Sequence, residues 1–181
     1  EDAFREGVRT HMKRFPLGVA TSKDFYDSLG EGSKRPEIVE ALQSFTDRSH
    51  VPLIEARVNC TTGAAPEARL TQSTFRPIGM SLENRTWSVP VCVSSYGLTG
   101  APGRACTILS EASGALPLTG ACPAFIVPNA NGAGYYRFAL DERGWTALVA
   151  GFRRLSPAEQ IATLDSLQAS FSAGQVAASL V

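Results

Sequence analysis

The sequence predicts a mainly β protein, an antiparallel β-sandwich of the immunoglobulin-like kind, with an N-terminal helical segment and C-terminal helices. Two observations predict it. Apolar residues recur at helical spacing before His50, alternate with polar residues up to about residue 140, and return to helical spacing after Asp141. Clusters of Gly, Pro, Asn and Ser separate the alternating stretches, as turns separate short strands. The predicted divisions are 1–49, 50–140 and 141–181.

The first division is predicted to be helical. Its opening apolar residues recur three or four positions apart until Pro16 ends the pattern: Phe4, Val8, Met12 and Phe15. A second helix is expected after a cap formed by Thr21 and Asp24, and it should end before Gly30. A third should begin near Pro36, with an apolar face of Ile38, Val39, Leu42 and Phe45.

The middle division is predicted to hold short strands. In "PLIEARVNC", small and apolar residues alternate with Glu55, Arg57 and Asn59, which indicates a half-buried strand. Further strands are expected at "ARLTQSTFR", "TWSVPVCVSS", "RACTILS", "GALPL", "PAFIVP" and "YYRFAL". The last two should form a hairpin through an Asn131-Gly132 turn, with Tyr136, Phe138 and Leu140 on one face and Tyr135 and Arg137 on the other.

Two further helices are predicted after Asp141. The first should present Trp145, Leu148, Val149 and Phe152 on one face. Ser156, Pro157 and Glu159 then form the signature of a capping box, with proline at the first helical position. The second helix carries an apolar stripe of Ile161, Leu164, Leu167 and Phe171 that ends at Gly174.

Composition excludes several classes of partner. Hydrophobic residues make up 44% of the 181 residues, which is enough to build a core. The 17 basic and 17 acidic residues balance, so net charge steers no nucleic acid to this chain. No apolar run approaches the roughly 20 residues that span a bilayer. The chain begins within an expected helix, without initiator Met or signal peptide, so we expect it to be a piece of a longer protein.

The four cysteines have no Cys-x-x-Cys spacing, which argues against a zinc ribbon or a redox motif. Cys92 and Cys106 are symmetric about Thr99 in a long hairpin, so we expect a disulfide between them. By alternation, Cys92 lies on the face of its strand opposite the neighbouring valines, whereas Cys106 lies on the same face as Ile108. A bulge in one strand could bring the two cysteines onto the same face. Cys60 and Cys122 would then pair, which implies a periplasmic or secreted protein. Buried reduced cysteines in a cytoplasmic protein are the alternative.

The search for chemistry finds no catalytic and no metal-ligating residue. The two histidines, His11 and His50, do not begin a His-Glu-x-x-His motif. A Gly-x-Ser-x-Gly elbow and a phosphate-binding loop are absent, and the carboxylates are scattered over strands and turns. Trp87 alternates with Val89 and Val91, which favours a place in the core over a sugar-stacking platform.

Six stretches, in chain order, carry a resemblance to a known family. "FREGVRTHMKRFPLGVATSKDFYDSL" resembles the late helices of a thermolysin-like catalytic domain. "SFTDRSHVPLIEARV" resembles the start of a sandwich domain, with Phe45 where the family has Trp and His50 where it has Gly. "RLTQSTF", "WSVPVCV" and "GYYRFALDERGW" are similar to three strands, and "LSPAEQIATLDSLQASFSAGQV" to the first helices of a C-terminal helical domain. The family is that of the aminopeptidase N-like zinc metallopeptidases, and the match covers nearly the whole chain.

The resemblance implies a parent enzyme that removes N-terminal residues from peptides with a zinc-bound water and a catalytic glutamate. All of those groups would precede Glu1, so this chain would be a non-catalytic fragment with no cofactor of its own. Its sandwich would be a spacer between the parent's catalytic and helical domains, which are its expected partners. Arg137 and Asp141 would contact a neighbouring domain. Apolar helix faces around Phe4, Val8, Ile161 and Leu164 would then be left without partners here.

A second hypothesis belongs to another class of protein. The expected disulfides and the lack of catalytic residues also suit a secreted β-sandwich module that binds carbohydrate or protein. The sequence alone leaves both hypotheses open.

Overall fold

The computed structural model describes residues 2–180 and divides the chain after Ser49 into two compact units. The first unit is helical. Its elements are α1 (Asp2–Arg14), α2 (Ser22–Ser33) and α3 (Glu37–Thr46). The predicted cap of α2 is confirmed, since the Asp24 amide donates to Thr21 Oγ1 over 3.2 Å and the Thr21 amide donates to Asp24 Oδ2 over 2.8 Å.

The predicted end of α2 at Gly30 is wrong. The helix continues to Ser33 and ends at Lys34, whose φ of 57° closes it in the left-handed conformation. Gly32 lies inside the helix because α1 crosses it there. A Cβ on Gly32 would meet the Cα of Gly7 at 2.6 Å, so glycine permits the close approach of the two helices.

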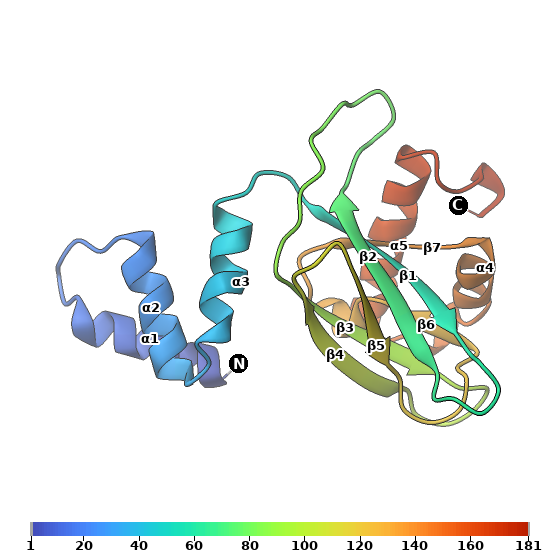
Figure 1. Cartoon of the computed structure of the whole chain (residues 1–181), viewed down its shortest axis with the longest axis horizontal. Helices are drawn as coiled ribbons and strands as arrows, with labels where there is room; N and C mark the ends of the chain where they lie inside the picture. The colour runs from blue at the N-terminus through green and yellow to red at the C-terminus, as the bar shows by residue number, and fades with distance from the viewer. Residues whose placement is uncertain (1, 181) are drawn as a thin grey trace. The chain divides into compact units, whose positions relative to one another are not determined.

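The second unit contains two sheets and the remaining helices (Figure 1). One sheet has the strand order β5-β2-β1-β7, and its strands are β1 (Pro52–Asn59), β2 (Glu67–Thr74), β5 (Ser113–Pro117) and β7 (Arg137–Leu140). The other has the order β4-β3-β6, with β3 (Val89–Tyr96), β4 (Gly103–Leu109) and β6 (Phe125–Val127). All seven predicted strand regions therefore contain a strand.

Most strand pairs are antiparallel, as predicted, but β7 runs parallel to β1. The predicted hairpin between β6 and β7 is also wrong, because these strands belong to different sheets. Residues 128–136 cross from one sheet to the other through a short turn, η1 (Ala130–Gly132). A tight hairpin joins only antiparallel strands, whereas a strand that follows a crossover connection can pair in parallel.

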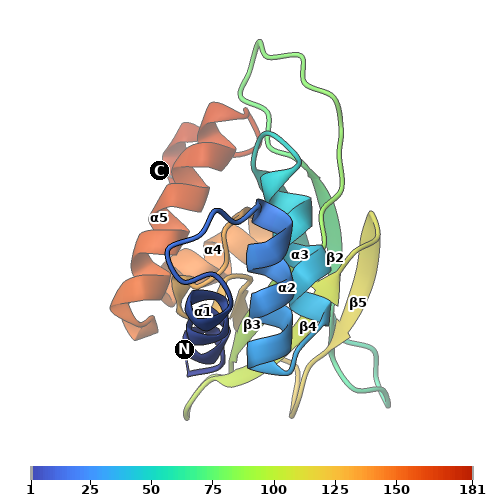
Figure 2. The same ribbon diagram turned by 90° about the vertical axis from the view of Figure 1, so that its left-hand side faces the viewer.

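The segment between β2 and β3 projects beyond the end of β2 (Figures 1 and 2). The part of this segment that runs back towards β3 is held against β2 by two hydrogen bonds. The Thr74 amide donates to Asn84 Oδ1 over 2.9 Å, and Thr74 Oγ1 donates to the Glu83 carbonyl over 2.9 Å. Trp87, at the end of this segment, is buried as predicted.

Gln72 of β2 links the two sheets. Its side-chain nitrogen lies 2.9 Å from the carbonyl oxygen of Trp87, just before β3, and 3.0 Å from that of Leu109, at the end of β4. The amide of Trp87 donates back to Gln72 Oε1 over 2.8 Å. Because Gln72 is buried, these bonds satisfy polar atoms that water does not reach.

The C-terminal elements are α4 (Glu142–Ala150), η2 (Phe152–Arg154), α5 (Pro157–Ser172) and η3 (Ala178–Leu180). Residues 141–180, predicted to begin a separate helical domain, lie in the same compact unit as the sheets. They share a core with β6 and β7. The rings of Trp145 and Phe138 stack at 5.5 Å, and Leu148 and Leu167 are buried in the same cluster.

Helix α5 has an unusual distribution of polarity. Its buried residues are mainly small or polar: Glu159, Thr163, Ser166, Leu167, Ala169 and Ser170. Three of the four residues in the predicted apolar stripe face solvent, with exposed fractions of 71% for Ile161, 55% for Leu164 and 44% for Phe171. The buried face of α5 is therefore the one with small and polar side chains, and the hydrophobic pattern did not predict it.

Candidate functional site

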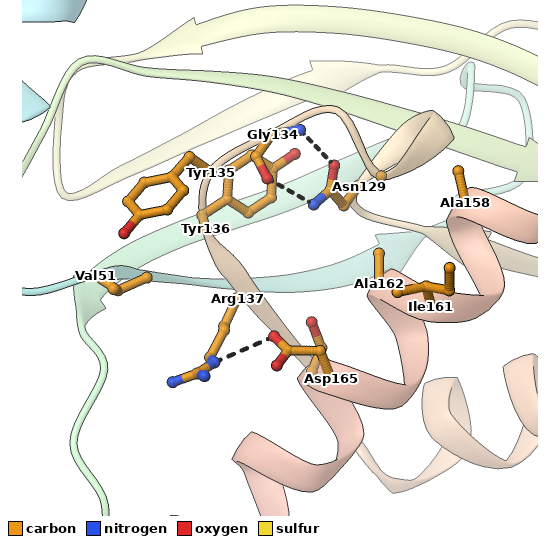
Figure 3. A pocket seen from close by; sticks show the side chains of 12 residues that line it. Val51, Asn129, Gly134, Tyr135, Tyr136, Arg137, Ala158, Ile161, Ala162 and Asp165 are labelled. Atoms are coloured by element: carbon orange, nitrogen blue, oxygen red, sulfur yellow. Dashed lines mark hydrogen bonds and ion pairs between the residues drawn. The ribbon is translucent and has the colours of Figure 1, made fainter.

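The crossover between β6 and β7 forms one wall of a cleft in the second unit. The side chain of Asn129, which is 4% exposed, lies inside this loop and links it to Gly134 (Figure 3). Its side-chain nitrogen donates to the Gly134 carbonyl over 3.0 Å, and the Gly134 amide donates to its oxygen over 2.9 Å. Tyr136 adds a hydrogen bond of 2.7 Å to the Pro128 carbonyl, and its burial raises the pKa of the phenol.

The Asn131-Gly132 pair was predicted to supply positive φ angles, and this is confirmed at 57° and 60°. The pair serves the crossover and not a hairpin. A Cβ on Gly132 would lie 2.7 Å from the Ala158 carbonyl oxygen, so the glycine also lets the loop approach the first turn of α5.

Helix α5 forms the opposite wall. The guanidinium of Arg137 on β7 reaches Asp165 on α5, with Nε 3.3 Å from Oδ2 (Figure 3). It also stacks over the Phe75 ring, 4.5 Å from the ring centroid. Next to it, the Phe138 amide donates to Ser166 Oγ over 3.2 Å. The strand and the helix are thus joined by one charged and one neutral hydrogen bond.

The cleft between these walls has a volume of about 340 Å³. Val51, Tyr135, Arg137, Ala162 and Asp165 line it (Figure 3). Tyr135 is 72% exposed and Ile161 71% exposed, so the rim is apolar and aromatic while an ion pair lies beside it. This arrangement suits a ligand or protein surface with apolar and hydrogen-bonding groups close together.

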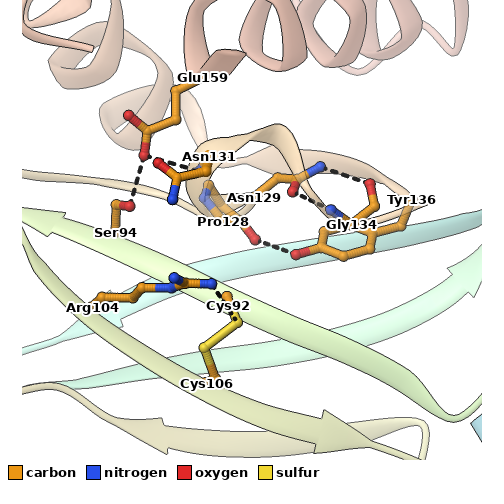
Figure 4. The surroundings of a disulfide bond; sticks show 10 residues. All are labelled: Cys92, Ser94, Arg104, Cys106, Pro128, Asn129, Asn131, Gly134, Tyr136 and Glu159. Carbon is orange, nitrogen blue, oxygen red and sulfur yellow. Dashed lines mark hydrogen bonds between the residues drawn. A yellow bond between two sulfur atoms is a disulfide. The ribbon is translucent and has the colours of Figure 1, made fainter. Parts of the chain in front are cut away.

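A second set of contacts surrounds Glu159, which is only 2% exposed (Figure 4). Ser94 Oγ donates to Oε1 over 2.7 Å, and Tyr96 Oη donates to Oε2 over 2.8 Å. The amide and hydroxyl of Ser156 also donate to Oε2, over 3.1 and 3.0 Å. The predicted capping box is confirmed, but its glutamate also binds two residues of β3.

These contacts determine the ionisation of the site. Burial raises the pKa of Glu159, but hydrogen bonds from Ser94, Tyr96 and Ser156 oppose that effect and hold the pKa below its usual value. Burial, followed by the hydrogen bond and the charge of Glu159, raises the pKa of Tyr96 to about 12. Glu159 is therefore a charged hydrogen-bond acceptor at neutral pH.

Both predicted disulfides are present. Cys92 and Cys106 are direct partners in the β3–β4 register, and Cys60 is bonded to Cys122. No bulge is needed, because Ile108 is 44% exposed and lies with both sulfurs on the outer face. The two bonds are typical of an oxidising compartment.

The predicted interdomain residues have local roles in the structure. Arg137 pairs with Asp165, and Asp141 caps α4 through a 2.9 Å hydrogen bond from the Gly144 amide. Their contact with a neighbouring domain stays a prediction. The sequence pattern did not reveal Asp165, or a role of Glu159 beyond its cap, because their partners lie 28 or more positions away in the chain. Asn129 was also missed, although its partner Gly134 is only five positions away.

Within residues 2–180, no three His, Cys, Asp or Glu side chains gather as a group that could hold a metal ion. None of the described helices is long and apolar enough to cross a bilayer. A scan of the chain against models of known protein families finds no match. The resemblance to the zinc aminopeptidases therefore remains a hypothesis.

Proposed function

We propose that this chain is a non-catalytic structural part of a zinc aminopeptidase that removes N-terminal residues from peptides. Its sheets act as a spacer between a catalytic domain and a helical domain. The observation that carries the proposal is the polarity of α5. This helix buries small and polar side chains against the sheets and presents Ile161, Leu164 and Phe171 outward. An outward stripe of large apolar residues suits a helix that a further helical layer covers.

We further infer that the two sheets form an immunoglobulin-like sandwich. Four and three strands match the strand numbers of that architecture. Val89, Val91 and Val93 alternate along β3 with no exposed surface, which suits a strand whose inner face packs on a second sheet. The hydrogen bonds of Gln72 between the sheets support the same arrangement.

A spacer must hold its neighbours at a fixed angle, and the contacts of α5 suit that role. Glu159 fastens the first turn of the helix to β3, and Asp165 fastens its third turn to Arg137 of β7. These two attachments restrain both rotation and sliding of α5 on the sheets. A helical layer packed on Ile161 and Leu164 would then have a defined orientation relative to the sheets.

The proposal assigns no catalysis to this chain. We expect the purified protein to leave aminoacyl-p-nitroanilides intact with added Zn²⁺, and to hold no stoichiometric zinc after dialysis. Zinc-dependent turnover would show that the assignment is wrong. The coding sequence supplies a second test, since the proposal expects a His-Glu-x-x-His helix within roughly 200 residues upstream. An unrelated catalytic or repeat domain there would contradict it.

A second candidate is a secreted module that binds carbohydrate or protein. The observation that favours it is the cleft beside α5, where exposed Tyr135 lies near the Arg137–Asp165 pair. An aromatic ring next to charged hydrogen-bonding groups can bind a sugar. A glycan array probed with the wild type and with Tyr135→Ala tests this. Signals that Tyr135→Ala abolishes would favour the module, and an array without signals would argue against carbohydrate as the ligand.

A further inference from the structure

The Cys92–Cys106 disulfide lies on the outer face of the β3–β4 hairpin (Figure 4). The two residues are directly opposite each other, and their Cα atoms are 4.1 Å apart. Most disulfides have Cα separations of about 4.4–6.8 Å, so the paired strands hold these cysteines closer than usual. The two residues also differ in exposure, because Cys106 is exposed whereas Cys92 is half-buried.

Arg104 lies beside the half-buried sulfur. It pairs with Ser94 in the register, so its side chain shares the outer face with both cysteines. Its Nη2 atom is 3.6 Å from Cys92 Sγ (Figure 4). A guanidinium at this distance stabilises a thiolate and lowers the pKa of the corresponding thiol. A sulfur of lower pKa is also a better leaving group in thiol–disulfide exchange.

Three charged side chains line the cleft next to Arg104: Arg104 itself, Arg154 and Glu159. Arg154 donates to the Gly97 carbonyl over 2.7 Å, and the carboxylate of Glu159 accepts hydrogen bonds from Ser94, Tyr96 and Ser156. Two guanidiniums against one carboxylate give this lining a net positive charge.

The Cys60–Cys122 disulfide provides an internal comparison. Both of its cysteines are exposed, and its Cα separation is 5.9 Å. Arg57, Arg143 and Asp141 line the cleft beside this bond, but the polar contact given for its sulfurs is with an oxygen, the Pro123 carbonyl 3.9 Å from Cys122 Sγ. An oxygen carries negative partial charge and does not stabilise a thiolate. Accessibility alone would favour exchange at this bond, whereas the guanidinium in direct contact with Cys92 Sγ favours exchange at the other bond.

We propose that Cys106 is a modification site for small-molecule thiols of the glutathione class, with Arg104 stabilising the departing Cys92. The attacking thiolate forms a bond to Cys106 Sγ, and the bond between Cys106 and Cys92 breaks. The electron pair of that bond leaves on Cys92, which becomes a thiolate beside the guanidinium. One disulfide replaces another, so no separate oxidant or reductant is needed. A second thiol can attack the mixed disulfide and release Cys106.

The site of attack can be read directly. The folded oxidised chain is incubated with reduced glutathione, quenched in acid, alkylated and analysed by peptide mass spectrometry. We expect glutathione on Cys106 and the alkyl group on Cys92, appearing before any adduct on Cys60 or Cys122. Glutathione mainly on Cys92, or earlier exchange at Cys60–Cys122, would overturn the proposal.

The role of Arg104 is tested with variants that remove the same charge at two places. Arg104→Gln should slow exchange at Cys106 by at least about threefold, since a leaving thiol of higher pKa departs more slowly. Arg153→Gln, an exposed arginine on η2, should leave the rate unchanged, and Arg104→Lys should retain part of it. The rate at Cys60–Cys122 in the same sample reports any general loosening of the fold. Equal rates for Arg104→Gln and the wild type would refute the role of Arg104.

Discussion

The hydroxyl of Tyr96 donates to the carboxylate of Glu159 over 2.8 Å, and this hydrogen bond joins the end of β3 to the first turn of α5. The two residues are 63 positions apart in the chain. The carboxylate accepts from Ser94 and from Ser156 as well, so one buried side chain caps a helix and docks it. A buried charge of this kind stabilises the fold only while all of its hydrogen bonds are intact.

We therefore expect Glu159→Ala to destabilise the protein by about 2–4 kcal/mol, because the hydroxyls of Ser94 and Tyr96 lose a charged acceptor. Urea unfolding measures the change. Glu142→Gln, at an exposed glutamate in the first turn of α4, should cost less than about 0.5 kcal/mol. Equal losses for the two variants would contradict the role of the Glu159 contacts.

The same carboxylate should give the protein an acid-sensitive contribution to stability. Since its folded pKa lies below the usual 4.5, this contribution is present above pH 4.5 and is lost as the pH falls through the folded value. Glu159→Gln should therefore flatten the decline in unfolding free energy below pH 4.5. Parallel pH profiles for the variant and the wild type would show that Glu159 does not titrate in this way.

The outward face of α5 should promote association of the isolated chain. Ile161→Ser combined with Leu164→Ser should lower the apparent mass in light scattering at high concentration and change stability little, because both residues are exposed. Leu167→Ser, on the buried face, should instead lower the unfolding free energy by about 2 kcal/mol or more. A wild-type protein that stays monomeric at high concentration would count against this prediction.

Gly132 should be more sensitive to substitution than a glycine of similar backbone conformation elsewhere. Gly120 has a φ of 85°, and a Cβ added there would meet no atom within 4 Å, so Gly120→Ala should cost only the backbone strain, about 1 kcal/mol. Gly132→Ala adds a clash with the Ala158 carbonyl and should cost at least about 1 kcal/mol more. Thermal unfolding of the two variants compares them, and equal melting temperatures would argue against a tight contact between the loop and α5.

The disulfides should contribute unequally to stability. In the chain-entropy description, a bond between residues 62 positions apart stabilises by about 4 kcal/mol, and one between residues 14 apart by about 3 kcal/mol. Replacing Cys60 and Cys122 by Ser should thus lower the unfolding free energy more than replacing Cys92 and Cys106. The reverse order in urea unfolding would show that local contacts outweigh the loop entropy.

Local patterns predicted the features that depend on nearby residues. The capping boxes at Thr21 and Ser156, the strand at Val89 and the pairing of Cys92 with Cys106 all follow from spacing within a short stretch. Periodicity did not predict the end of α2, because Gly32 serves a close contact with Gly7 of α1 and does not end the helix. Sequence spacing likewise could not predict that β6 and β7 lie in different sheets.

The sequence by itself determined where helices and strands lie in this protein, since alternation, caps and turn residues act over a few positions. Only the tertiary structure decided which face of α5 is buried. The helix offers two possible faces, and the buried one carries Glu159 and small residues because β3 supplies Ser94 and Tyr96 as donors. The hydrogen bonds that stabilise this orientation of α5 join residues more than 60 positions apart, so no local sequence pattern predicts it.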